Sequence, residues 1–126
     1  MLFRSTFTGR VHQAKIASPG VLEGYSSLDP ANCLCGLPGL QLLDSLAVDG
    51  SGNVCVATLI NGGISVINPA DGGVTHVATD DLLTTNICFG DRDGSGEYRD
   101  AYITCSGTGR LLHMRWPHKG LRLNYV

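Results

Sequence analysis

The sequence has few charged residues, no basic cluster and no long hydrophobic run. Charged residues make up 16% of the 126 residues and hydrophobic residues 43%, a balance typical of a globular protein. Lys and Arg do not cluster and the formal net charge is −2, which argues against a nucleic-acid or acidic-membrane surface. No stretch approaches the roughly 20 apolar residues of a membrane span, and the N-terminus lacks the apolar run of a signal peptide. We therefore expect a cytoplasmic protein.

The cysteines do not follow a metal-binding or redox pattern. Their number is odd, and Cys33 and Cys35 are separated by one residue instead of the two residues of zinc and thioredoxin-like motifs. Cys55, Cys88 and Cys105 lie inside apolar strand patterns, where a free thiol behaves as a small hydrophobe. This pattern favours buried, reduced thiols over disulfides or metal ligands, and hence a reducing compartment.

Glycine is abundant, at 17 residues, and glycine-rich turns separate the strands of an internal repeat. The segments that begin at Asp44 and Asn86 share one order of pieces: an apolar strand ending in Asp, a Gly-rich turn, an alternating strand, a Gly turn and another alternating strand. Their starting positions, 44 and 86, set a period of 42 residues. Four short strands in a repeat of that length are typical of a β-propeller blade. The sequence therefore predicts an all-β fold made of propeller blades.

Strands and turns can be placed within this repeat. We expect strands over 54–59, 64–69 and 73–79 in the first copy, and over 101–106 and 111–116 in the second. Residues 61–63 (Asn-Gly-Gly) predict a hairpin, because these residue types reach positive φ at little cost. Asp49 and Asp91 end the innermost strands and precede glycine turns, so they are interpreted as Asx-turn residues.

One partial propeller domain is expected over residues 1–126. Residues 1–41 are interpreted as the remnant of an earlier blade, 42–83 as a complete blade and 84–126 as the last blade. In the remnant, 11–17 is expected as a third strand, 20–22 and 33–38 as an outer strand, and 23–32 as an exposed loop. Propellers need about four to eight blades, so these blades would require missing N-terminal blades or a homo-oligomer to close a ring.

Chemistry is expected where the innermost strands converge on the propeller channel. Asp44 and Asn86 hold equivalent points there and offer a carboxylate and an amide oxygen, which suit Ca²⁺, Mg²⁺ or Mn²⁺ better than Zn²⁺. Ser45 could add a hydroxyl. The alternative is that Asp44 and Asn86 are turn or capping residues bonded to the local backbone. Both interpretations remain open from the sequence.

Several strings together resemble one family. DSLAVDGSGN at 44–53, TTNICFG at 84–90 and SGTGRLLHMRWPHKGLRLNY at 106–125 are similar to the last two blades of the senescence-marker-protein/gluconolactonase family, also called luciferin-regenerating-enzyme-like. The similarity is close over residues 36–126 and loose over 1–35. It implies the C-terminal part of a six-bladed propeller and a divalent-metal-dependent hydrolase of sugar lactones or related esters.

The resemblance also implies roles for individual residues. Asp44 would be a metal ligand and the catalytic carboxylate, Ser45 would join the metal shell, and Asn86 would line the channel. The family's other two metal ligands, a Glu and an Asn, belong to blades that lie outside this sequence. The alternatives are a non-catalytic propeller module for binding or scaffolding, and a truncated fragment without activity.

Overall fold

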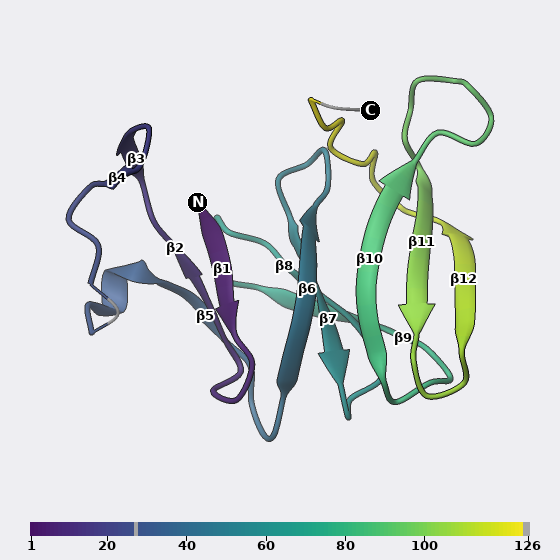
Figure 1. The fold of residues 1–126 in the computed structure, drawn as a ribbon, viewed down its shortest axis with the longest axis horizontal. Coiled ribbons are helices and arrows are strands. Elements are labelled where there is room, and N and C mark those ends of the chain that lie inside the picture. The colour runs from purple at the N-terminus through teal and green to yellow at the C-terminus, as the bar shows by residue number, and fades with distance from the viewer. Residues whose placement is uncertain (27, 125–126) are drawn as a thin grey trace.

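The computed structural model describes residues 1–26 and 28–124, and within these ranges the chain forms antiparallel sheets and no α-helix. Three main sheets follow one another along the chain and lie side by side from left to right in Figure 1, and a small two-stranded sheet accompanies the first of them. The predicted all-β fold of propeller-blade type is therefore confirmed. No helix in the described part of the chain is long and apolar enough to cross a membrane.

The first sheet has three main strands. Strand β1 (Leu2–Ser5) pairs with β2 (Arg10–Gln13), which pairs with β5 (Cys33–Gly36). The sequence pattern did not predict β1. The short strands β3 (Ile16–Ser18) and β4 (Val21–Leu22) form a separate two-stranded sheet, so the assignment of 20–22 to the outer strand was wrong. A 3-10 helix, η1 (Pro30–Asn32), ends the connection to β5.

The middle sheet contains four strands in sequential order. They are β6 (Leu42–Val48), β7 (Val54–Leu59), β8 (Gly63–Ile67) and β9 (Val74–Ala78). The predicted hairpin between β7 and β8 is present, and Gly62 in it has a φ of +55°. A Cβ at this glycine would lie 2.9 Å from the carbonyl oxygen of Asp81. Only glycine therefore fits the turn without strain.

The last sheet contains β10 (Thr84–Gly90), β11 (Asp100–Cys105) and β12 (Arg110–Arg115). In the described residues it has no fourth strand. The chain instead returns to the end of β6, where Asp49 and Gly120 form an isolated bridge and Leu121 N–H donates to the Val48 carbonyl at 3.4 Å. The C-terminal segment therefore ties the last sheet to the middle one.

Two hydrophobic clusters hold the three sheets together, one on each face of the middle sheet. Side chains that alternate along β7 divide between them, because successive residues of a strand point to opposite faces. The cluster toward the first sheet comprises Val11, Leu37, Leu43, Val54, Val56 and Ile67. The cluster toward the last sheet comprises Cys55, Ala57, Ile64, Ile87, Ala101, Ile103, Cys105 and Trp116. The middle sheet is thus covered on both sides.

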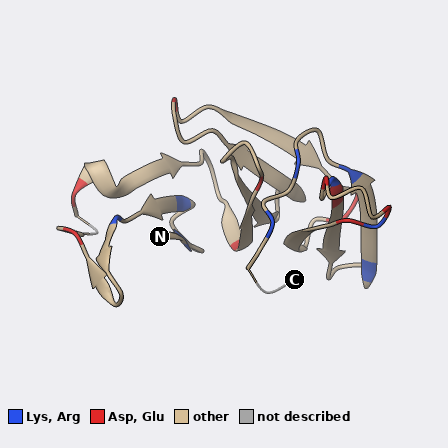
Figure 2. Cartoon of the chain, turned by 90° about the horizontal axis from the view of Figure 1, so that it is seen from above, with Lys and Arg blue, Asp and Glu red and all other residues tan. Residues whose placement is uncertain are grey.

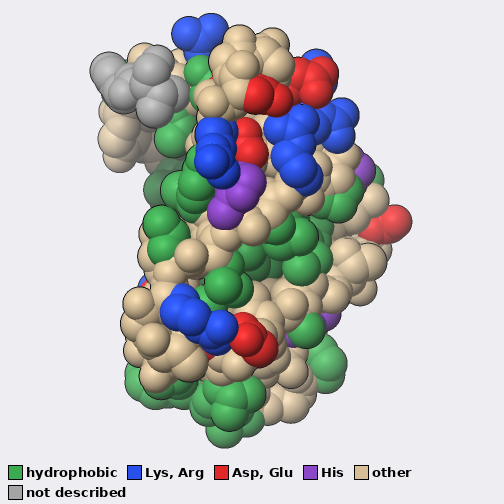
Figure 3. Space-filling model, turned by 90° about the vertical axis from the view of Figure 1, so that its right-hand side faces the viewer, with side chains coloured by type: hydrophobic (Ala, Val, Ile, Leu, Met, Phe, Trp, Pro, Cys, Tyr) green, Lys and Arg blue, Asp and Glu red, His purple; other side chains and the backbone are tan. Residues whose placement is uncertain are grey.

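Charged residues lie mostly in turns and at strand ends, with both signs interleaved around the last sheet (Figure 2). The side of the molecule on which β12 lies shows hydrophobic side chains in its middle and charged groups of both signs above and below (Figure 3). Leu111 on β12 is 65% exposed. This mixture agrees with the low net charge of the sequence.

A buried carboxylate fastens the β9–β10 connection to the β11–β12 hairpin. Asp81 is only 3% exposed. It accepts hydrogen bonds from the backbone N–H of Leu83 at 2.8 Å and of Gly107 at 3.2 Å. It also accepts from both the backbone N–H and the hydroxyl of Thr108. These bonds, led by the Thr108 hydroxyl, lower the pKa of the Asp81 carboxyl.

Cys88 corrects one part of the cysteine prediction. Cys55 and Cys105 are buried as expected, Cys33 and Cys35 are half-buried, and Cys88 is exposed. Cys88 lies opposite Tyr102 on the face of the last sheet that no other sheet of the described residues covers. Burial, followed by the negative charge of Asp49, raises the pKa of the Cys55 thiol to about 12. All five cysteines are unpaired.

Replacement of Ile103 by Ala is expected to lower the free energy of unfolding by about 2–5 kcal/mol, because it removes buried surface and leaves a cavity. Ile103 is 1% exposed in the cluster between the middle and last sheets. The matched control is Leu111→Ala on the neighbouring strand, which should change stability by no more than about 0.5 kcal/mol. Urea denaturation measures both, and equal effects of the two substitutions would contradict this packing.

Lowering the pH should weaken the hydrogen bonds that the Asp81 carboxylate accepts from the β11–β12 hairpin. Its folded-state pKa lies below the unfolded value of about 3.9, so its contribution to stability is present above that pH and is lost as pH falls through the folded pKa. The Tm difference between the wild type and Asp81→Asn should be largest near pH 7 and shrink below about pH 4. Asp71→Asn, in an exposed turn, serves as the control. A Tm difference that does not vary with pH would argue against this role.

Thiol labelling should distinguish the exposed from the buried cysteines. In the native protein at pH 8, Cys88 is expected to react with a thiol reagent well before Cys55, which should react only on unfolding, because the thiolate is the reactive form. Peptide mapping by mass spectrometry assigns each label. Early labelling of Cys55 would show that its strand is not buried.

Candidate functional site

The site is built where the innermost strands β6 and β10 face the edge strand β1. An open depression of about 440 Å³ lies there. Seven residues line it: Leu2, Phe3, Arg4, Asp44, Ser45, Leu46 and Asn86. The structure therefore brings together all three site residues predicted from the sequence. It adds Arg4, which the sequence analysis missed because β1 itself was not predicted.

A β-bulge places Asp44 and Ser45 in this depression. Leu43 pairs with Thr58 and Leu46 pairs with Val56, so Asp44 and Ser45 both lie opposite one residue of β7. Such a bulge bends a strand and redirects its side chains. A second register shift lies beside Asn86 on β10. The two inner strands thus have irregularities at nearly the same point.

The Asp44 carboxylate is next to a cation. Nη2 of Arg4 lies 3.6 Å from Oδ1 of Asp44, and the two side chains are about one-third exposed. Arg4 Nε also donates a 2.7 Å hydrogen bond to the backbone carbonyl of Asp44, and Nη1 donates to the Thr6 hydroxyl at 2.8 Å. These contacts fix the guanidinium beside the bulge.

Other predicted turn residues have the local role that was expected. Asp49 is fully buried and accepts hydrogen bonds from the backbone N–H groups of Ser51 and Asn53, at 2.9 and 3.0 Å. Asp91 accepts from the backbone N–H of Gly96 at 2.7 Å. The Asx-turn interpretation is confirmed for Asp49, whose carboxylate bonds the residue two positions on. Asp91 also bonds its own loop, but to a residue five positions on, so it does not form an Asx turn. The side-chain oxygen of Asn86 likewise accepts from the N–H of Ile87 at 2.8 Å, which leaves its amide nitrogen as the group free to donate.

The residues of this chain do not by themselves fit a divalent metal ion. The depression offers one carboxylate, one hydroxyl and the amide oxygen of Asn86, which already accepts one hydrogen bond, whereas Ca²⁺ takes about six to eight oxygen ligands. Arg4 also places a positive charge beside the same carboxylate. Within residues 1–26 and 28–124, no three His, Cys, Asp or Glu side chains form a group that could hold a metal.

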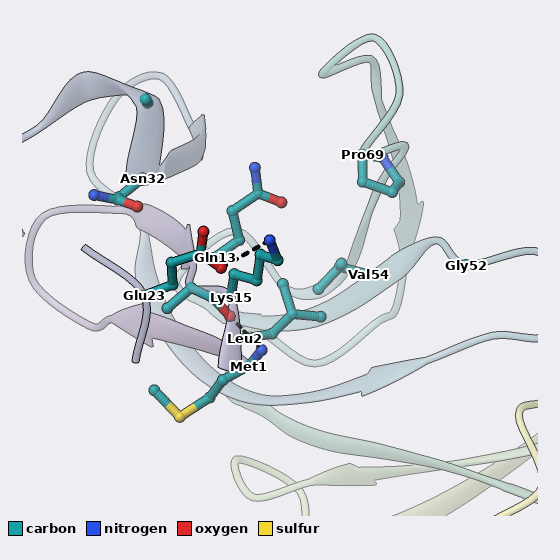
Figure 4. Close-up of a pocket in the computed structure, with 11 residues that line it drawn as sticks. Met1, Leu2, Gln13, Lys15, Glu23, Asn32, Gly52, Val54 and Pro69 are labelled. Atoms are coloured by element: carbon teal, nitrogen blue, oxygen red, sulfur yellow. Dashed lines mark hydrogen bonds and ion pairs between the residues drawn. The ribbon is translucent and has the colours of Figure 1, made fainter. Parts of the chain in front are cut away.

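A larger cavity, of about 610 Å³, lies between the first sheet and the turns of the middle sheet (Figure 4). Its charged groups, Lys15 and Glu23, pair with each other at 2.7 Å, and their side chains are 76% and 55% exposed. Met1 donates its terminal amine to the Ala14 carbonyl. None of the predicted site residues lines this cavity. The smaller depression beside Asp44 is therefore the candidate site, because it is lined by the predicted residues.

The successive antiparallel sheets define a chain of the β-propeller class. Comparison with protein families supports this, because the family described as SMP-30/Gluconolactonase/LRE-like region matches residues 1–107. The chain belongs to this family. The match includes the first sheet, where the sequence resemblance was loose. Comparison with curated proteins gives no match.

Proposed function

We propose that this chain forms the Asp44 side of a hydrolase site that acts on sugar lactones or related esters, as in gluconolactonase-like propellers. The observation that carries the proposal is the convergence of Asp44, Ser45 and Asn86 on one open depression at a bulged inner strand. Membership of the SMP-30/gluconolactonase family supports the same substrate class.

In the proposed reaction Asp44 acts as a general base. Its carboxylate takes a proton from a water molecule while the water oxygen adds to the carbonyl carbon of the lactone. The ring C–O bond then breaks, the ring oxygen takes up a proton, and an open-chain hydroxy acid is released. The amide nitrogen of Asn86 and the hydroxyl of Ser45 are placed to hydrogen-bond the substrate oxygens.

The divalent metal expected from the family resemblance would need oxygen ligands from outside this chain. Further propeller blades or a second copy of the chain are the two sources we propose. The first and last sheets each leave one face uncovered by another sheet of the described chain, so both have a surface on which more blades could pack. The five unpaired cysteines favour a cytoplasmic location.

The Arg4–Asp44 ion pair favours a second candidate, a binding module without catalysis. A carboxylate that is paired with a guanidinium already has its counter-ion, and a ligand could be held there without being hydrolysed. Turnover distinguishes the two candidates, because only the hydrolase releases a hydroxy acid.

The decisive variant is Asp44→Asn, which keeps the shape of the side chain and removes the base. Hydrolysis of gluconolactone above its spontaneous rate, with Ca²⁺, Mn²⁺ or Zn²⁺ present, should fall by about 100-fold or more, the typical contribution of a general base. The matched control is Asp71→Asn, in an exposed turn between β8 and β9, which should keep the wild-type rate. Equal rates for the two variants would remove Asp44 from the mechanism. A wild-type rate no higher than the spontaneous one would favour the binding module.

A further inference from the structure

The guanidinium of Arg4 is held in place, but not all of its N–H donors make hydrogen bonds. Two of its hydrogen bonds are made within the described residues, one from Nε to the Asp44 carbonyl and one from Nη1 to the Thr6 hydroxyl. An arginine side chain carries five N–H donors, so three make no hydrogen bond, although Nη2 also lies 3.6 Å from the Asp44 carboxylate. Arg4 lines the depression and its side chain is 33% exposed, so these donors can reach a ligand there.

The free donors suit a carboxylate. The planar fork of a guanidinium matches the two oxygens of a carboxylate, and such charge-assisted hydrogen bonds are stronger than neutral ones. Because Arg4 is already oriented by Asp44 and Thr6, it loses little conformational freedom when it binds a ligand. A fixed arginine of this kind selects an anion without needing a metal ion.

The rest of the depression suits hydroxyl groups. Asp44 accepts hydrogen bonds, the Asn86 amide nitrogen donates them, and Ser45 can do both. Arg4 balances the charge of Asp44, so the lining as a whole does not repel an anion. A volume of about 440 Å³ lies within the usual range for small-molecule sites, about 300–1,000 Å³.

We infer that this depression binds a small polyhydroxylated carboxylate, a sugar acid, without a metal ion, and that Arg4 holds its carboxylate. The inference rests on the proposed function because it concerns the same site. The hydroxy acid released by lactone hydrolysis is a ligand of this class. The inferred binding differs from metal-assisted binding in needing only side chains of this chain.

The test uses the whole chain in buffer with EDTA and two ligands that share a carbon skeleton. D-gluconate carries the carboxylate, and D-glucitol has a neutral CH₂OH in its place. Amide chemical shifts in NMR titrations report affinity and location, and the shifted amides should include those of residues 3–4, 44–46 and 86. Gluconate should bind about tenfold more tightly than glucitol. Equal affinities, or gluconate binding only after a divalent ion is added, would overturn the inference.

Substitutions then assign the effect to Arg4. Arg4→Gln should abolish the preference for gluconate, and Arg4→Lys, which keeps the charge but loses the fork, should retain part of it. The matched control is Arg110→Gln, because Arg110 also pairs with an aspartate, Asp80, but lies outside the depression. An unchanged preference in a folded Arg4→Gln variant would contradict the assignment.

The outcome is separable from that of the hydrolysis assay. Gluconate binding in EDTA without turnover of gluconolactone would refute hydrolysis and leave the carboxylate site standing. Turnover that depends on Asp44, in a protein that shows no gluconate preference in EDTA, would refute the carboxylate site alone.

Discussion

Burial of both faces of the β6–β9 sheet is the constraint on which the rest of the structure depends. Ile64 faces the last sheet and Ile67 the first, and each is fully buried. Burying an isoleucine side chain contributes about 1.5–3 kcal/mol, more than the roughly 0–1 kcal/mol of an exposed ion pair. The relative placement of β1, β6 and β10, and with it the depression, follows from this packing.

The candidate site depends on local irregularity within that regular frame. A strand without a bulge would keep strict alternation, and Asp44 and Ser45 would point to opposite faces. The bulge at these two residues instead lets both line the same depression. Arg4 then completes the site from a strand that is 40 residues away in sequence from Asp44. The result is a cation and an anion side by side, which explains why the residues of this chain suit an organic anion better than a metal.

The sequence predicted much of the fold because the repeat is strong. The alternating apolar pattern over 54–59 corresponds to β7, and the Asn-Gly-Gly signal at 61–63 lies at the β7–β8 hairpin. The N-terminal part was harder to predict. Strand β1 carries Arg4 and Ser5 in a run of four residues and has no clear period, and the Val21–Leu22 strand pairs with a neighbour instead of extending the sheet. Short strands contain too few residues to show a hydrophobic alternation, so tertiary packing decides which strand each of them pairs with.

The sequence by itself determined the class of the fold and the candidates Asp44, Ser45 and Asn86, because residue periodicity and turn chemistry are local properties. Its motifs also carried the resemblance to the family, which the family comparison supports. Only the tertiary structure decided that Arg4 lies beside Asp44, that Cys88 is exposed, and that the Asn86 oxygen bonds its own strand. Strand register and sheet-to-sheet packing set these features, and both depend on contacts between residues far apart in the chain.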